Sequence, residues 1–180
     1  MYGRLIAIVG PSGSGKDTLI SGLQSQIKAH FPTRFITRQS FPNDEKYTPV
    51  SKKEFQHLID TNQLAFYWSA HNLSYGIPII INQFLSKGKD VIFNCSRVAL
   101  NEISQKYTNL EIIIITAPPE ILKMRLIARG RETTGEIASR VNRNVDTKLT
   151  GAITVDNSKS IEEGLINLIK AINQSAKTFQ

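Results

Sequence analysis

The sequence has few of the residue types on which several protein classes depend. Its 180 residues include one cysteine and three scattered histidines. Cys95 alone cannot form an internal disulfide, and the histidines lack metal-ligand spacing, so a disulfide framework and a zinc centre are excluded. The longest strongly apolar stretches, residues 5–10 and 112–116, are too short to cross a bilayer. With no secretion signal at the amino terminus, we expect a cytoplasmic protein with no membrane partner.

Positive charge exceeds negative charge, with 22 Lys and Arg against 15 Asp and Glu, a net charge of +7. Six of the cations lie within residues 123–143, and five of those six are arginines, which form forked contacts with phosphate oxygens. Taken alone, such a run is also typical of a solvated helix face. Because no recognition motif or interleaved aromatics accompany it, we expect no nucleic-acid partner.

Apolar runs with the character of buried strands alternate with segments of helical periodicity along the whole chain. This alternation predicts an α/β fold with a mostly parallel sheet, in which ligands bind beyond the carboxyl ends of the strands. Residues 39–49 are expected to form a loop. The expected strands are 4–9, 34–37, 64–70, 90–94, 110–116 and 152–155, and the expected helices are 16–30, 51–60, 78–88, 98–106, one from 118, 133–148 and one from 160.

A glycine-rich segment ending in lysine follows the first strand and opens the first helix. This phosphate loop comprises Gly10, Pro11, Ser12, Gly13, Ser14, Gly15 and Lys16. It matches the pattern in which backbone N–H groups surround a phosphate and the lysine reaches the β- and γ-phosphates of a nucleotide. The hydroxyl residue that usually follows the lysine to bind Mg²⁺ is replaced by Asp17, with Thr18 next. Both offer oxygen ligands to the metal, although Asp17 also suits a helix N-terminus.

Further motifs follow the phosphate loop along the chain. They are Thr37-Arg38, Tyr47, Val50-Ser51, Glu54-Phe55, Tyr75-Gly76-Ile77-Pro78, Gly88-Lys89-Asp90-Val91, Arg125-Leu126, Arg129-Gly130, Glu136-Ile137 and Arg140. Together with the phosphate loop, they make the chain resemble the guanylate kinase family over nearly its whole length. That resemblance implies a P-loop NTPase three-layer sandwich that uses ATP and Mg²⁺, as a single domain with core residues 1–33, 88–125 and 145–180. It also implies a small acceptor-binding region, about residues 34–87, and a helical lid, about residues 126–144.

Departures from that family lie where guanine would be bound. The family's second arginine after the Thr-Arg pair is Phe41 here, and its guanine-reading glutamate is Ser69. An aspartate expected after the strand at 90–94 is also missing. A pocket without these carboxylates loses the acceptors for the base N–H groups, so guanine is disfavoured.

Five motifs of the chain set it apart within that family. They are Gly15-Lys16-Asp17, Ile36-Thr37-Arg38, Tyr75-Gly76-Ile77-Pro78, Asn94-Cys95-Ser96-Arg97 and Thr116-Ala117-Pro118-Pro119-Glu120. This set resembles a narrower group, the ribose 1,5-bisphosphate phosphokinases of phosphonate degradation. That resemblance implies phosphoryl transfer from ATP to ribose 1,5-bisphosphate, giving ADP and 5-phosphoribosyl 1-diphosphate.

Roles for individual residues follow from the same resemblance. Positive side chains would neutralise charge during transfer, and a second set would hold a small phosphorylated sugar. A surface position at a strand end is the alternative for Arg38, core packing is the alternative for Tyr75, and helix capping is the alternative for Ser96 and Arg97. The candidates for catalysis are Lys16, Arg125, Arg129 and Arg140, and those for substrate binding are Arg38, Tyr47, Tyr75, Ser96 and Arg97.

Two other functions remain open at this point. One is a nucleoside monophosphate kinase, including a guanylate kinase with an altered pocket. The other is a non-catalytic guanylate kinase-like interaction module, which the intact phosphate loop and lid arginines disfavour. The oligomeric state also stays open, with a homodimer as one option.

Overall fold

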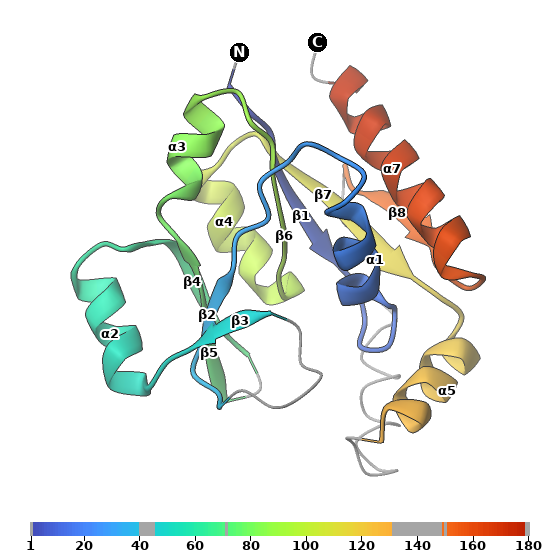
Figure 1. Cartoon of the computed structure of the whole chain (residues 1–180), viewed down its shortest axis with the longest axis horizontal. Coiled ribbons are helices and arrows are strands. Elements are labelled where there is room, and N and C mark those ends of the chain that lie inside the picture. The colour runs from blue at the N-terminus through green and yellow to red at the C-terminus, as the bar shows by residue number, and fades with distance from the viewer. Residues whose placement is uncertain (1, 40–45, 71, 131–148, 150, 179–180) are drawn as a thin grey trace. The chain divides into compact units, whose positions relative to one another are not determined.

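The computed structural model describes all residues except 1, 40–45, 71, 131–148, 150 and 179–180 (Figure 1). The chain forms two compact units. The first unit comprises residues 1–6 and 28–110, and the second comprises residues 7–27 and 111–180. The expected helix at 133–148, most of the expected lid and Arg140 lie outside the described residues. The division into core, acceptor region and lid stays a prediction.

The second unit carries the phosphate loop and the most apolar strand. In this unit β7 and β8 pair in parallel, from Ile113 opposite Ile153 to Thr116 opposite Asp156. Helix α7 packs against β8 and α1. The strand β1 starts in the first unit and continues into the second, and its sheet has the order β6-β1-β7-β8. The bounds are β1 Leu5–Val9, α1 Lys16–Leu23, β7 Leu110–Thr116, α5 Pro119–Arg129, β8 Ile153–Asp156 and α7 Ile161–Thr178.

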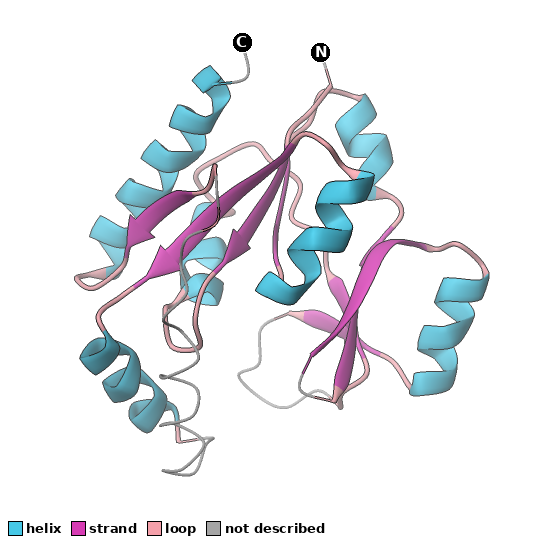
Figure 2. Cartoon of the chain, turned by 180° about the vertical axis from the view of Figure 1, so that it is seen from behind, coloured by secondary structure: helices cyan, strands magenta, loops and turns pink. Residues whose placement is uncertain are grey.

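The first unit contains a smaller mixed sheet with the order β3-β2-β5-β4. Here β2 pairs in parallel with β3 and antiparallel with β5, and β4 and β5 form an antiparallel pair. Helix α2 lies beside this sheet (Figure 2), where a Cβ added to Gly76 of β5 would meet Phe55 of α2. The bounds are β2 Arg34–Ile36, β3 Tyr47–Pro49, α2 Lys52–Asp60, β4 Leu64–Ala70, β5 Leu73–Pro78, α3 Ile81–Ser86, β6 Val91–Asn94, η1 Arg97–Ala99 and α4 Leu100–Lys106.

Local sequence signals explain where several elements begin. The Ser51 hydroxyl accepts a hydrogen bond from the Glu54 N–H at 3.1 Å, and the Glu54 carboxylate accepts one from the Ser51 N–H at 2.6 Å. This reciprocal capping box confirms the predicted start of α2. Burial on both faces explains the isoleucine run of β7, where Ile113, Ile114 and Ile115 are buried.

The predicted first helix is too long. Helix α1 ends at Leu23, not near His30. Residue 30 instead forms a bridge with Val91 beside β6, in which its N–H donates to Asp90 O at 2.7 Å and its carbonyl accepts from Ile92 N at 2.9 Å. Pairing with a strand needs an extended backbone at residue 30. The helix therefore cannot continue to this residue, although the apolar spacing favoured it.

Two strands of the small sheet were not predicted. The helix expected at 78–88 is present, but its predicted start is wrong, because Pro78 ends the unpredicted strand β5 and α3 spans Ile81–Ser86. Asn72, with φ of 61°, allows the tight turn between β4 and β5. The expected loop at 39–49 is also wrong in part, because Tyr47–Pro49 forms β3. A three-residue strand carries too little periodicity to be recognised, and its partner strand stabilises it.

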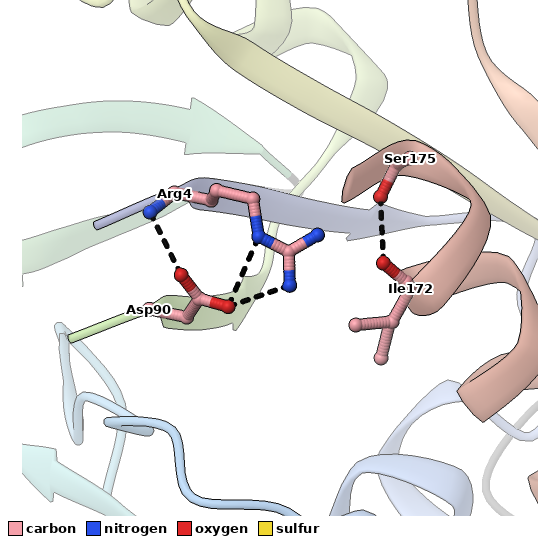
Figure 3. A network of polar contacts seen from close by, with 4 residues as sticks. All are labelled: Arg4, Asp90, Ile172 and Ser175. Carbon is pink, nitrogen blue, oxygen red and sulfur yellow. Dashed lines mark hydrogen bonds and ion pairs between the residues drawn. The ribbon is translucent and has the colours of Figure 1, made fainter. Parts of the chain in front are cut away.

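An ion pair joins the residue before β1 to the residue before β6 (Figure 3). Arg4 donates from Nε to Asp90 Oδ2 at 3.0 Å and from Nη2 to the same oxygen at 2.6 Å, and its backbone N–H donates to Oδ1 at 2.9 Å. Within α7, the Ser175 hydroxyl donates to Ile172 O at 3.0 Å. Among the helices that the structure describes, none is long and apolar enough to span a membrane.

The stability of the fold should depend on pH through the protonation of His30. Burial lowers the pKa of His30 from its ordinary value of 6.5, and the charge of Lys89 lowers it further. The unfolded chain therefore takes up the proton first, so stability should fall as the pH drops from about 7 to about 5. His30 stacks on Phe84 at 3.7 Å between ring centroids. His30→Phe, which keeps an aromatic ring there, should reduce the fall in Tm over this range by roughly a few degrees.

Differential scanning fluorimetry across this pH range measures the effect. The matched control is Gln83→Ala, because Gln83 is an exposed, non-titrating residue of α3 next to Phe84 and the change should leave the pH dependence of Tm as in the wild type. An identical fall in Tm for wild type and His30→Phe would contradict the assignment.

Candidate active site

The phosphate loop joins β1 to α1 in the second unit. Gly13 and Gly15 have φ of 82° and 83°, in the left-handed region that favours glycine. A Cβ at Gly10 would collide with the carbonyl oxygen of Ile115, so the loop passes close to the backbone of β7. Ser14 is fully buried. The loop therefore makes the tight turn between strand and helix that lets backbone N–H groups bind a phosphate.

The lysine of the loop lies against the loop's own carbonyl groups. Lys16 Nζ donates to Gly10 O and to Pro11 O, each at 2.8 Å, and lies 3.4 Å from Ser14 Oγ. The side chain is half-buried. This geometry holds a positive charge inside the curve of the loop, where phosphate oxygens can replace the carbonyls as its partners.

Helix α5 packs on the phosphate loop and brings an arginine to it. A Cβ on Gly13 would lie 2.9 Å from Leu122 O and 3.3 Å from Leu126 Cγ. Arg125, from the same helix, has its Nη1 within 4.0 Å of a Cβ position on Gly15. That nitrogen is buried and has no hydrogen-bond partner among the residues that the structure describes. A buried donor without a partner is costly, and nucleotide phosphates at the loop would satisfy it.

The remaining lid candidates differ in position. Arg129 lies one turn after Arg125 on α5 and is exposed. Residues four apart share one side of a helix, so Arg129 and Arg125 lie on the same side of α5. Arg140 lies outside the described residues.

The two candidate metal ligands occupy the first turn of α1. Asp17 and Thr18 are both exposed. Within the described part of the chain, no group of three or more His, Cys, Asp or Glu side chains could hold a metal ion. Mg²⁺ needs only one or two protein oxygens when phosphates and waters complete its shell, so a carboxylate and a hydroxyl here fit it.

In the first unit, two of the predicted substrate residues form a pair. Arg38 Nε donates to Tyr47 Oη at 3.1 Å, and the guanidinium carbon lies 4.9 Å from the centre of the Tyr47 ring. The Tyr47 hydroxyl donates in turn to Gln39 O at 2.8 Å. Stacking on a ring reduces the conformational freedom of the guanidinium.

A second arginine–tyrosine pair lies on the same face of the small sheet. Arg34 is opposite Tyr47 in the register, and Ile36 is opposite Tyr75. The side chains that share this face are therefore Arg34, Ile36, Tyr47 and Tyr75. The Arg34 guanidinium carbon lies 5.8 Å from the Tyr75 ring centre, and Tyr75 stacks on Trp68 with centroids 5.3 Å apart. Arg34, 7% exposed, was not predicted as a site residue.

Ser96 and Arg97 follow β6. The Ser96 hydroxyl accepts from Val98 N at 3.4 Å and caps the short helix η1, which was the alternative to a substrate role. Arg97 is the first residue of η1 and is half-buried. A contact of either residue with substrate stays a prediction.

Comparison with known proteins identifies the class first. The family model described as guanylate kinase matches residues 2–175. The guanylate kinase structure from Anaplasma phagocytophilum is similar with a TM-score of 0.69 and 16% identity, covering 96% of this chain and 86% of that one. A gluconokinase from Sinorhizobium meliloti gives a TM-score of 0.58 at 14% identity, over 99% of this chain and 96% of that one. The expected fold class is confirmed, and with its phosphate loop it defines a P-loop kinase.

Sequence relatives then define the group. A ribose 1,5-bisphosphate phosphokinase from Bradyrhizobium diazoefficiens is 37% identical over 97% of this chain and 90% of the relative. One from Agrobacterium fabrum is 38% identical over 98% and 100%. A bifunctional ribose 1,5-bisphosphokinase-thymidine phosphorylase from Roseobacter denitrificans is 40% identical over 96% of this chain but 26% of the relative. The chain belongs to the guanylate kinase family, among its ribose 1,5-bisphosphate phosphokinases.

Proposed function

We propose that this protein transfers the γ-phosphate of ATP to the 1-phosphate of ribose 1,5-bisphosphate, giving ADP and 5-phosphoribosyl 1-diphosphate. The observation that carries the choice of acceptor is the sheet face with two arginine–tyrosine pairs, Arg38 with Tyr47 and Arg34 with Tyr75. The Arg38 guanidinium suits the acceptor phosphate that does not react, while the buried Arg34, which donates from Nη1 to Asn94 O at 3.5 Å, would support the Tyr75 ring. The names of the full-length relatives point to the same substrate.

In the proposed reaction, an oxygen of the acceptor's 1-phosphate attacks the γ-phosphorus of ATP. The bond from that phosphorus to the β–γ bridging oxygen breaks, and ADP leaves with the electron pair. A phosphomonoester has a second pKa near 6, so the attacking group is largely dianionic at neutral pH and needs no general base. The main barrier is the approach of two anions, so catalysis is positioning plus charge neutralisation.

Residues of the second unit would hold the donor. The loop N–H groups and Lys16 would bind the β- and γ-phosphates, and Arg125 would place its buried Nη1 on a phosphate oxygen. Arg129 and Arg140 would add positive charge as the transferred group develops its negative charge. Mg²⁺, held at Asp17 and Thr18, would supply charge neutralisation at the bridging phosphates.

Residues of the first unit would hold the acceptor. Arg38 and Tyr47 would bind one phosphate, with Arg34 and Tyr75 beside them on the same sheet face. Ser96 and Arg97 would contact the sugar phosphate from the end of β6. The cytoplasmic location and the absence of nucleic-acid and membrane partners stay predictions, and the oligomeric state stays open.

A coupled assay of ADP release tests this function. ADP should form when ATP, Mg²⁺ and ribose 1,5-bisphosphate are all present, and its rate should fall to the background when the sugar bisphosphate is omitted. A non-catalytic interaction module would release no ADP with any acceptor, and a nucleoside monophosphate kinase would release it with a nucleotide instead.

Asp17→Asn should raise the Mg²⁺ requirement. The change removes a negative ligand without altering size, so the Mg²⁺ concentration at half-maximal rate should rise several-fold while ATP binding at saturating metal changes little. The measurement is a Mg²⁺ titration of initial rates. Asp60→Asn at the end of α2 is the matched control. A titration of Asp17→Asn that overlays the wild type would leave Asp17 with only a helix-terminal role.

A further inference from the structure

A buried asparagine connects the phosphate loop to the end of the sheet in the second unit. Asn157 follows β8 and is 4% exposed. Its Nδ2 donates to Ser14 O at 2.8 Å, across 143 positions of sequence. Its backbone N–H donates to Thr116 O at 2.8 Å, at the end of β7. One residue therefore ties the middle of the phosphate loop to the carboxyl ends of two strands.

Two glycines make room for this carboxamide. A Cβ on Gly15 would lie 2.6 Å from Asn157 Nδ2, and a Cβ on Gly164, in the first turn of α7, would collide with Oδ1. The amide thus fills the space between the loop and α7 with no room for a larger group. Its position is determined from both sides.

The two ends of the Asn157 carboxamide differ in their hydrogen bonding. The Ser14 carbonyl requires a donor, so the amide nitrogen must face the loop. The other end, Oδ1, is buried and has no hydrogen-bond partner within the described ranges. A buried acceptor left without a partner is unfavourable for folding. A residue that served stability alone would satisfy both ends or would be apolar, so the bond to Ser14 indicates another role.

We infer that Asn157 is a positioning residue of the phosphate loop, and this inference rests on the proposed nucleotide site. The Ser14 carbonyl and the Gly15 N–H belong to one planar trans peptide unit, in which they point in opposite directions. Because Asn157 holds the carbonyl on its own side, the Gly15 N–H is held pointing away from Asn157. N–H groups of such loops are the donors that bind phosphate. Asn157 therefore sets the direction of a donor without touching the nucleotide.

Titration calorimetry of Mg²⁺-ADP with the full chain tests this inference. Asn157→Leu keeps the branched shape of the side chain but removes the donor and adds bulk, so the Kd for ADP should rise at least about ten-fold. Asn157→Ala removes the donor without adding bulk, and it should raise the Kd at least about three-fold even if a water partly replaces the amide. Both should leave the KM for ribose 1,5-bisphosphate within about two-fold of the wild type.

A matched control separates positioning from stability. Asn82 accepts a hydrogen bond from the Tyr107 hydroxyl at 2.9 Å and lies in the first unit. Asn82→Leu should lower Tm and leave the Kd for ADP unchanged. If the folded Asn157 variants lower Tm but bind ADP like the wild type, Asn157 is merely structural and the inference is overturned. If the wild type itself binds no ADP, the proposed nucleotide site fails and the inference fails with it.

Discussion

Replacing Lys16 by alanine is expected to lower kcat/KM by on the order of 10³ or more in a protein that still folds. The Lys16 ammonium lies within the curve of the loop, 2.8 Å from each of two loop carbonyls. In the proposed reaction it would move onto the β- and γ-phosphate oxygens and offset the charge that develops during transfer. Loss of one such preorganised cation removes stabilisation that water cannot replace.

Steady-state kinetics of Lys16→Ala measure this effect, with a thermal melt to verify the fold. Lys170→Ala is the matched control, because Lys170 is an exposed lysine of α7 in the same unit and its loss should change kcat/KM by less than about two-fold. Near-normal turnover by a folded Lys16→Ala protein would contradict the role given to the phosphate loop.

The second large effect concerns the acceptor. Ribose 1,5-bisphosphate should be phosphorylated with a kcat/KM at least ~10²-fold above that for GMP, about 2.7 kcal/mol in transition-state binding. Ser69, at the position that would read guanine, offers a hydroxyl and no carboxylate. The small sheet places Arg38 against Tyr47, where it would hold the phosphate that does not react, while Arg125 and Arg129 would meet the reacting phosphate. A sugar with a phosphate at each end suits this arrangement better than a nucleotide with one phosphate and a base.

The comparison uses initial rates for both acceptors at matched sub-saturating concentrations. Arg38→Ala should lower kcat/KM for ribose 1,5-bisphosphate by an amount equivalent to a few kcal/mol of transition-state binding, because it removes a charge-assisted phosphate contact. Arg38→Lys is the matched variant, because it keeps the positive charge but lacks the guanidinium group that donates a hydrogen bond to Tyr47. If GMP is the better substrate, the proposed acceptor is wrong, and the P-loop kinase fold is all that stands.

Strong local signals made parts of the fold predictable. The apolar run before Gly10, the isoleucines of β7 and the box of Ser51 and Glu54 each define an element within a short stretch of sequence. In each of these places the local preference and the final packing agree, which is the condition under which sequence patterns identify elements well.

Residues whose positions depend on distant partners were harder to predict. The strand at Tyr47–Pro49 exists because β2 pairs with it, and the path at residue 30 follows from its bridge to Val91. Arg34 was not predicted as a site residue for the same reason, because only the register of the small sheet brings it next to Tyr75. Asn157 had one usable signal, because it directly follows a strand of the parallel sheet, where functional side chains gather.

The most direct test of the central claim is ³¹P NMR of the mixture formed from ATP, Mg²⁺, ribose 1,5-bisphosphate and the enzyme. We expect the signals of ADP together with those of a new diphosphate, whose two phosphorus atoms couple to each other, while the 5-phosphate keeps its single resonance. Growth of ADP and inorganic phosphate alone, with the 1-phosphate of the sugar unchanged, would contradict the transfer proposed for this protein.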